Sequence, residues 1–148
     1  MQVHECCNPD VVWCNRDAAI QDVAALMRKH HVGSVVVTDA EDRKKPIGIL
    51  TDRDIVMDVM ATGLDARAIT AGDVMSTPVV TVRDKDGLAE TLGLMRTHKI
   101  RRIPVVTDGG ALLGIVAVDD VVNLLAKELQ SLSGAIIGQQ MLEEHVRR

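Results

Sequence analysis

The segment Gly48-Ile49-Leu50-Thr51-Asp52-Arg53-Asp54-Ile55 returns later in the chain as Gly114-Ile115-Val116-Ala117-Val118-Asp119-Asp120-Val121. The sequence ahead of each segment also recurs, because the stretch from Val11 to His30 matches the stretch from Val79 to His98 at a shift of 68 positions. Such a period predicts two copies of one structural unit packed together. Equivalent polar groups from both copies then meet at a seam, where we expect the functional site.

Both copies are predicted to follow the order strand–helix–strand–strand–helix. In the first copy, Asp17 is the expected N-cap of a helix over 18–30, and Gly33 is expected in its C-terminal turn. The β-branched run 34–38 predicts a buried strand. The remaining strands are predicted over 11–14, 46–50, 79–82, 103–107 and 112–116, and the remaining helices over 88–98, 119–129 and, with Thr70 as cap, 70–75. A charged turn is predicted over 39–45.

These elements predict an α/β fold, α+β and sandwich-like in its layers, with two β-α-β-β-α repeats related by pseudo-twofold symmetry. The repeats are expected over residues 1–62 and 63–129. Residues 130–148 carry apolar side chains from Leu132 to Val146, interrupted by Gly134 and Gly138. Two interpretations stay open for this tail, a terminal helix used in self-association and a frayed end.

Composition excludes several function classes. The chain has 148 residues, 47% of them hydrophobic, with no Phe, no Tyr and only Trp13 as an aromatic, so aliphatic side chains must fill the core. A net charge of −4 argues against non-specific nucleic-acid binding. No apolar run reaches the roughly 20 residues of a membrane span, and no signal peptide is visible. Three cysteines, two of them the adjacent Cys6 and Cys7, form a poor disulfide framework and favour a cytoplasmic location.

The repeated segment has the chemistry of a nucleotide site. After the strand ends, Thr51 offers a hydroxyl, and the unpaired N–H groups of a helix start can bind an anion. Asp54 lies on the same helical side, and its carboxylate can accept two hydrogen bonds from a vicinal diol. A diol beside a phosphate is what a ribonucleotide presents. In the alternative interpretation, Thr51 or Asp52 only caps the helix and Asp54 only favours its dipole. The recurrence at equivalent points favours the ligand site.

The chain resembles a tandem pair of CBS domains over about residues 5–129, on the basis of Gly48–Ile55, Gly114–Val121 and the stretch from His98 to Val106. The resemblance implies a stand-alone regulatory pair that senses an adenosyl ligand. AMP is the first candidate, and ADP, ATP, NAD and S-adenosylmethionine are the others. It also implies a homodimer that acts on an unknown effector protein. We find no catalytic pairing of residues and expect no enzyme activity.

By this resemblance each cleft combines groups from both repeats. In the first cleft Thr51 and Asp54 would hold phosphate or ribose, and Arg101, Arg102 and Arg53 would lie at the phosphate edge. The base would be flanked by Thr77, Pro78, Val79, Ile100, Ile103 and Pro104. For the arginine pair 101–102, a solvated surface pair is the alternative.

The second cleft departs from the family pattern. Asp120 is kept, but Ala117 stands where a hydroxyl is expected, Val36 replaces a proline, and Gly33-Ser34 replaces the basic pair. Its expected residues are Val12, Gly33, Ser34, Val35, Ala117 and Asp120. We expect this cleft to be weaker than the first, selective for another adenosyl species, or empty.

Two other interpretations compete with ligand sensing. A ligand-independent scaffold for dimerisation or partner docking is the main rival. A metal or redox cluster of His4, Cys6, Cys7 and Cys14 is weaker, because the spacing is poor for zinc, so we expect no metal site. His30 and His98 suit helix C-termini without any catalytic task. The methionines at 27, 57, 60, 75 and 95 fall on predicted apolar faces and are expected to fill the core.

Overall fold

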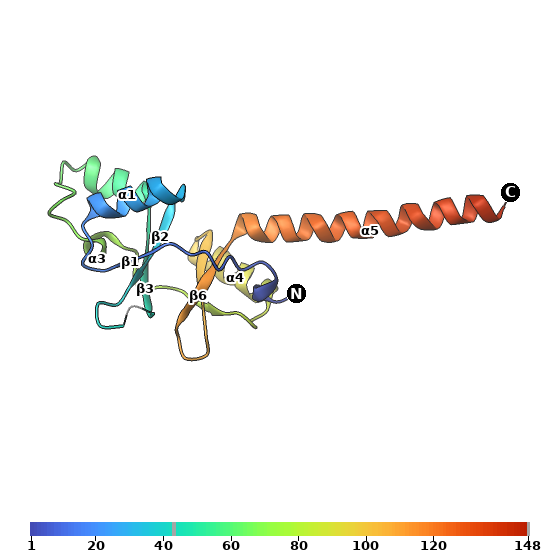
Figure 1. Ribbon diagram of the computed structural model, residues 1–148, viewed down its shortest axis with the longest axis horizontal. Helices are drawn as coiled ribbons and strands as arrows, with labels where there is room; N and C mark the ends of the chain where they lie inside the picture. Colours follow the sequence, from blue (N-terminus) through green and yellow to red (C-terminus); the bar gives the residue numbers. More distant parts are fainter. Residues whose placement is uncertain (43, 148) are drawn as a thin grey trace.

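A computed structural model describes residues 1–42 and 44–147, so Arg43 of the predicted charged turn and Arg148 of the tail lie outside the described residues. Figure 1 shows a two-part body from which one long helix projects. The elements in chain order are η1 (Val3–Glu5), β1 (Trp13–Asn15), α1 (Ile20–His30), β2 (Ser34–Thr38), β3 (Pro46–Thr51), α2 (Asp52–Asp54), η2 (Ile55–Met60), α3 (Ala71–Val74), β4 (Val82–Arg83), α4 (Leu88–His98), β5 (Arg102–Val106), β6 (Leu112–Ala117) and α5 (Val118–Val146).

Each repeat forms a three-stranded sheet with the same topology. β1 runs parallel to β2 and β2 antiparallel to β3, and β4, β5 and β6 pair in the same way. The registers correspond as well, because Ser34 pairs with Thr51 in one sheet and Arg102 with Ala117 in the other. The predicted α/β fold with two β-α-β-β-α repeats is therefore confirmed.

The two repeats have separate aliphatic cores, and the segment that precedes the first strand of each repeat packs against the core of the other. We call these the leading segments. Val3 is fully buried in the core of the second repeat, whereas Ala71 is fully buried in the core of the first. Backbone bonds fix both segments, since Asn8 pairs with Ile115 and Ser76 with Ile49. The exchange ties the repeats together by their backbones and sets the distance between their strand ends.

Gly48 and Gly114 occupy equivalent points where this exchange needs close backbone approach. A Cβ at Gly48 would overlap the side chain of Met75, and one at Gly114 would overlap the Asn8 carbonyl and the Cys7 thiol. The glycine that opens each repeated segment therefore admits the leading segment of the other repeat to the strand. Cys7 and Met75, which lie 68 positions apart, make equivalent contacts with these two glycines.

The helix ends differ from the sequence prediction. α1 begins after Ala19, which has extended backbone angles, so Asp17 is not its N-cap. Asp17 lies in the preceding turn, where its N–H donates to Asn15 Oδ1. The left-handed residue after α1 is His31 (φ 54°) rather than Gly33, and Lys99 (φ 56°) follows α4 in the same way. Both helices end at the repeated histidines, and the left-handed residue that follows each of them is not a glycine.

Two further predictions were wrong in detail. Strand pairing begins at Trp13 and Val82, later than predicted, and the residues ahead of them, Val11-Val12 and Val79-Val80, line the clefts. Met27 and Met95 are buried as expected, but Met57 and Met60 are 52% and 70% exposed. η2 is wound as a π-helix after Asp54, and its outer face stays uncovered in the monomer.

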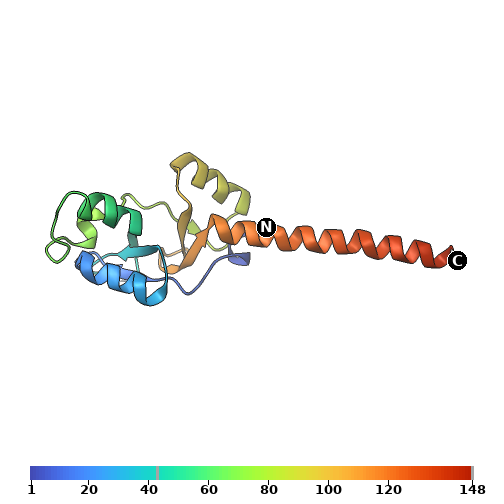
Figure 2. The ribbon, with the colours of Figure 1, turned by 90° about the horizontal axis from the view of Figure 1, so that it is seen from above.

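The C-terminal tail is part of a continuous helix. α5 runs without a break from Val118 to Val146 and includes both glycines that interrupt the apolar pattern. Only its beginning is anchored, because Val118, Val121 and Leu124 pack against the second core. Figures 1 and 2 show the remainder leaving the body in both views. The tail is therefore helical as far as Val146.

Candidate functional site

The first cleft lies between the repeats and has a volume of about 530 Å³. One wall is the junction of β3 with α2, and the other is formed by the second repeat. The lining residues are Ile49, Thr51, Arg53, Asp54, Ser76, Thr77, Pro78, Val79, Val80, His98, Lys99, Ile100, Arg101 and Arg102. Its size falls within the ~300–1,000 Å³ range of small-molecule sites.

Thr51 and Asp54 form a reciprocal cap at the start of α2. The Thr51 N–H donates to Asp54 Oδ2 at 2.8 Å, and the Asp54 N–H donates to Thr51 Oγ1 at 3.2 Å. Both side chains are thereby fixed at the cleft wall. A carboxylate has about four acceptor positions, so one backbone bond leaves capacity for a diol. The capping interpretation and the ligand interpretation are therefore compatible in this cleft.

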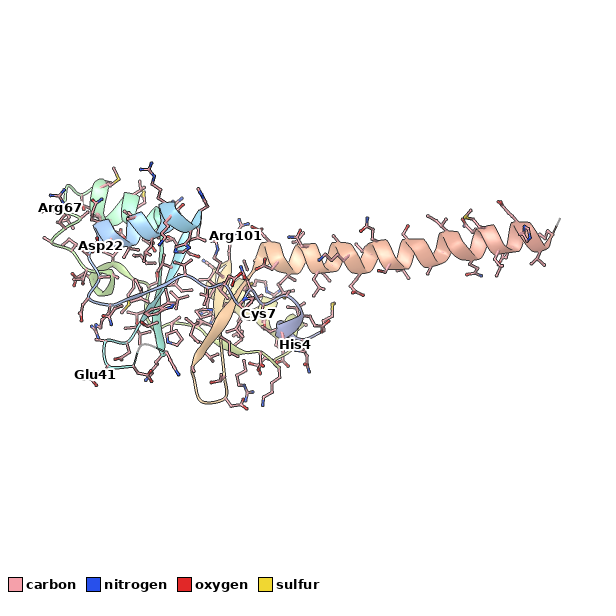
Figure 3. The ribbon with its side chains drawn as sticks, in the orientation of Figure 1. His4, Cys7, Asp22, Glu41, Arg67 and Arg101 are labelled. Carbon is pink, nitrogen blue, oxygen red and sulfur yellow. The ribbon has the colours of Figure 1, made fainter. Side chains whose placement is uncertain are left out.

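Four cationic side chains line the same cleft, namely Arg53, Lys99, Arg101 and Arg102. Against them stands the single carboxylate of Asp54. Arg101 lies 3.4 Å from Asp119 at the start of α5, and both side chains are 74% exposed; Figure 3 labels Arg101 at this place. An ion pair this exposed contributes little, so a phosphate could replace Asp119 as its partner. The charges suit an anionic ligand.

The second cleft is smaller, at about 230 Å³, and lies at the junction of β6 with α5. Its lining residues are Asn8, Asp10, Val11, Val12, His31, Val32, Gly33, Ser34, Arg102, Ile115, Ala117 and Asp120. Asp120 Oδ2 accepts from the Ala117 N–H at 3.0 Å, as Asp54 does from Thr51. The reciprocal bond is missing, because alanine has no hydroxyl.

The charge of the second cleft has the opposite sign. Asp10 and Asp120 contribute two carboxylates, and Arg102 is the one arginine or lysine among the described residues that line it. Arg102 also lines the first cleft, so the second cleft keeps more cationic character than its Gly33-Ser34 sequence predicted. Even so, an excess of carboxylates disfavours a phosphate.

The structure brings together most of the predicted site residues, with three exceptions. Ile103 and Val35 are fully buried in the two cores, because alternate strand residues point away from the cleft. Pro104 is buried as well and does not line the first cleft. The residues that sequence reasoning missed include Ser76, Asn8 and Asp10. The repeat could have located Asp10, since a shift of 68 places it at the predicted Pro78, but Asn8 corresponds to Ser76, which was missed as well.

Cys6 and Cys7 precede Asn8 of the second cleft, whereas Cys14 is buried in the core of the first repeat. Burial raises the pKa of Cys6 and Cys7, and the negative charge of Asp120 adds to this effect. Burial alone raises the pKa of Cys14 to about 11. Within residues 1–42 and 44–147, no three His, Cys, Asp or Glu side chains are placed to share a metal ion. Over the same part of the chain, no helix combines the length and apolar character needed to cross a bilayer.

The model of the family described as "CBS domain" matches residues 3–61 and 71–127, which is most of the chain. The chain belongs to the CBS-domain family. The resemblance stated from the sequence is thus confirmed, and the chain holds a pair of CBS domains.

Several proteins are similar to this CBS pair. An uncharacterized protein of Methanopyrus kandleri is 37% identical over 124 residues, covering 84% of this chain and 62% of that protein. A mitochondrial CBS domain-containing protein of Arabidopsis thaliana is 31% identical over 133 residues, covering 86% and 64%. The chain therefore spans less than two thirds of either relative. A structure of a CBS domain protein from Pyrobaculum aerophilum complexed with AMP aligns with a TM-score of 0.75 at 29% identity, covering 81% of this chain and 89% of that one.

Proposed function

We propose that this CBS pair is a regulatory module that binds an adenosyl ligand, AMP first, in the first cleft. The observation that carries the proposal is the Thr51–Asp54 cap standing opposite Arg101 and Arg102 in one cleft of suitable volume. The carboxylate of Asp54 would accept from the ribose hydroxyls, and the arginines would bind the phosphate. The similar protein from Pyrobaculum aerophilum, complexed with AMP, supports this choice.

The base would lie between aliphatic walls. Pro78 and Val79 on one side and Ile100 on the other line the cleft, and among the described residues no Phe, Tyr or Trp does. Adenine would thus be held by apolar contact and by backbone groups, without stacking on a Phe, Tyr or Trp ring. ADP, ATP, NAD and S-adenosylmethionine share the adenosine part and remain the other candidates. The chemistry of the phosphate edge favours anionic members of this group.

The ligand would act as a bridge between the repeats. Thr51 and Asp54 belong to the first repeat and Arg101 and Arg102 to the second, so binding links them across the seam. A ligand shifts a conformational equilibrium only by its differential affinity for the two states. We propose that the closed arrangement of the repeats binds the ligand more tightly. A cytoplasmic effector protein would then recognise the closed arrangement.

We also propose that two copies form a homodimer through the helices that follow the two caps. Val56 and Val122 occupy equivalent places two residues after Asp54 and Asp120, and both are more than half exposed. Met57 and Met60 extend the apolar surface beside Val56. Exposed apolar patches of this kind mark interaction surfaces. A dimer would cover both apolar surfaces. Its geometry would then be sensitive to ligand binding in the clefts.

A thermal-shift experiment tests ligand binding. A ligand at 100 times its Kd stabilises the folded state by about 2.7 kcal/mol, which for a chain of this size raises Tm by about 5–10 °C. We expect this rise with AMP and its loss in Asp54→Ala. An absence of any shift with AMP, ADP, ATP, NAD and S-adenosylmethionine would refute the proposal. It would favour the rival function, a ligand-independent scaffold, which the uncovered length of α5 supports.

A further inference from the structure

α5 presents far more apolar surface than a monomer can keep in water. From Val122 onward every described residue except Leu124 is exposed. The large apolar side chains among them are Val122, Leu125, Leu129, Leu132, Ile136, Ile137, Met141, Leu142 and Val146, at 38–77% exposure. Figure 3 shows side chains extending into open space along the part of this helix that leaves the body. A helix of about 44 Å with two internal glycines is marginal in water unless an apolar face is covered.

The exposed residues repeat at heptad spacing. Val122, Leu129 and Ile136 are seven residues apart, and Leu125 and Leu132 lie three residues after the first two. These five positions form one seam with the 3.5-residue period of a coiled coil. Gln139 follows Leu132 by seven residues and continues the same face. The seam thus runs from Val122 to Gln139.

We propose that α5 pairs in parallel and in register with α5 of a second copy of this chain. β-branched residues at the first heptad position and leucine at the fourth favour a parallel, two-stranded coiled coil, and Val122, Ile136, Leu125 and Leu132 follow that rule. Between Leu129 and Leu142 the helix carries no charge, so two identical copies meet without repulsion. An oppositely charged partner would find no complement there.

The available area is sufficient for such a pair. Each exposed apolar side chain of α5 presents on the order of 100 Å², so covering the seam on both copies removes on the order of 1,000 Å², the size that a specific interface requires. Gln139 of the two copies would face each other, which fixes the register as polar residues in coiled-coil seams do. The pairing needs no ligand and stands whether or not the first cleft binds AMP.

Cysteine cross-linking tests the pairing directly. In a parallel, in-register pair, Gln139→Cys places two thiols at the same seam position, and mild oxidation should join most chains as covalent dimers. Ser131→Cys, exposed on the outer face, is the matched control and should cross-link at least about tenfold more slowly. The natural Cys6, Cys7 and Cys14 lie on the body, and the unmodified chain gives the background.

A second pair of variants distinguishes pairing through the seam from non-specific hydrophobic association. Leu132 in the seam and Ile137 outside it are similarly exposed, at 60% and 53%. Added to the Gln139→Cys variant, Leu132→Asp should reduce cross-linking by about tenfold or more, whereas Ile137→Asp should leave it within about twofold. Equal cross-linking at positions 131 and 139, as in an antiparallel or unpaired helix, would overturn the proposal. An equal effect of the two aspartates would do the same.

Discussion

The two clefts are built on the same backbone and differ in their side chains. In both, an aspartate at the third helical position accepts from the N–H that precedes the helix, at 2.8 Å for Asp54 and 3.0 Å for Asp120. The first cleft adds the Thr51 hydroxyl, four cationic side chains and a volume of about 530 Å³. The second has an alanine, an excess of carboxylates and about 230 Å³. A duplicated fold thus keeps its caps while only one copy retains the chemistry for a phosphate.

The difference shows which part of the repeated segment belongs to folding and which to binding. The aspartate is needed by both helix starts, so its presence alone is no sign of a ligand site. The threonine, the basic residues and the open volume occur together only in the first cleft. Their coincidence supports ligand binding there more strongly than the motif does.

The largest effect is expected from the two aspartates. Asp54→Ala and Asp120→Ala each remove one bond to a backbone N–H, so their costs in folding stability should be similar, about 1 kcal/mol. Only Asp54→Ala should lower AMP affinity, by about 100-fold or more, because two hydrogen bonds to a charged group are lost. Calorimetric titration checks this. An equal loss of affinity in Asp120→Ala would break the distinction between the clefts.

The next effect concerns the phosphate. Arg102→Ala should weaken AMP binding by about tenfold or more and leave adenosine binding within about twofold, because only AMP offers an anionic partner. Arg67→Ala is the control, since Arg67 is exposed at the far end of the first repeat, where Figure 3 labels it. Titrations of both ligands measure the ratio. If Arg102→Ala weakened the binding of adenosine as much as that of AMP, the Arg102 side chain would support the folded structure of the cleft and not bind the phosphate.

A smaller effect is expected from exchanging the caps. Thr51→Ala removes the bond from the Asp54 N–H and should cost about 1 kcal/mol, whereas Ala117→Thr should add part of that amount to the second repeat. For a chain of this size the changes in Tm are about 2–4 °C in opposite directions. Thermal unfolding without ligand measures them. A fall in Tm for Ala117→Thr would mean that the second cleft cannot accept the hydroxyl.

The smallest effect uses Cys6 as a probe of the second cleft. Burial first, and then the negative charge of Asp120, raise the pKa of Cys6, so Asp120→Asn should lower that pKa and speed alkylation up to about threefold. Asp54→Asn should change nothing. Cys14, with its pKa raised to about 11 by burial, should be the slowest thiol in both variants. Mass spectrometry after timed alkylation gives the rates. An unchanged alkylation rate of Cys6 in Asp120→Asn would mean that Asp120 does not influence this thiol.

The repeat made much of the fold predictable. Alternating helices and β-branched runs located α1, α4 and the central strands, because burial imposes a period on the sequence. Helix ends were less predictable, as Asp17 shows, since a cap depends on where the chain turns. The exposure of Met57 and Met60 was missed for a related reason. Apolar spacing cannot distinguish a face that packs on the core from one that is left for a partner.

The site followed a similar division. The sequence by itself determined two repeats, two equivalent helix starts and the asymmetry of Thr51 and Ala117, because these depend only on residue type and order. The tertiary structure decided that Arg102 lines both clefts and that Ile103 and Val35 point into the cores. It also decided that α5 leaves the body as one helix. These features depend on side-chain direction and on contacts between distant segments, which are fixed only when the two repeats pack together.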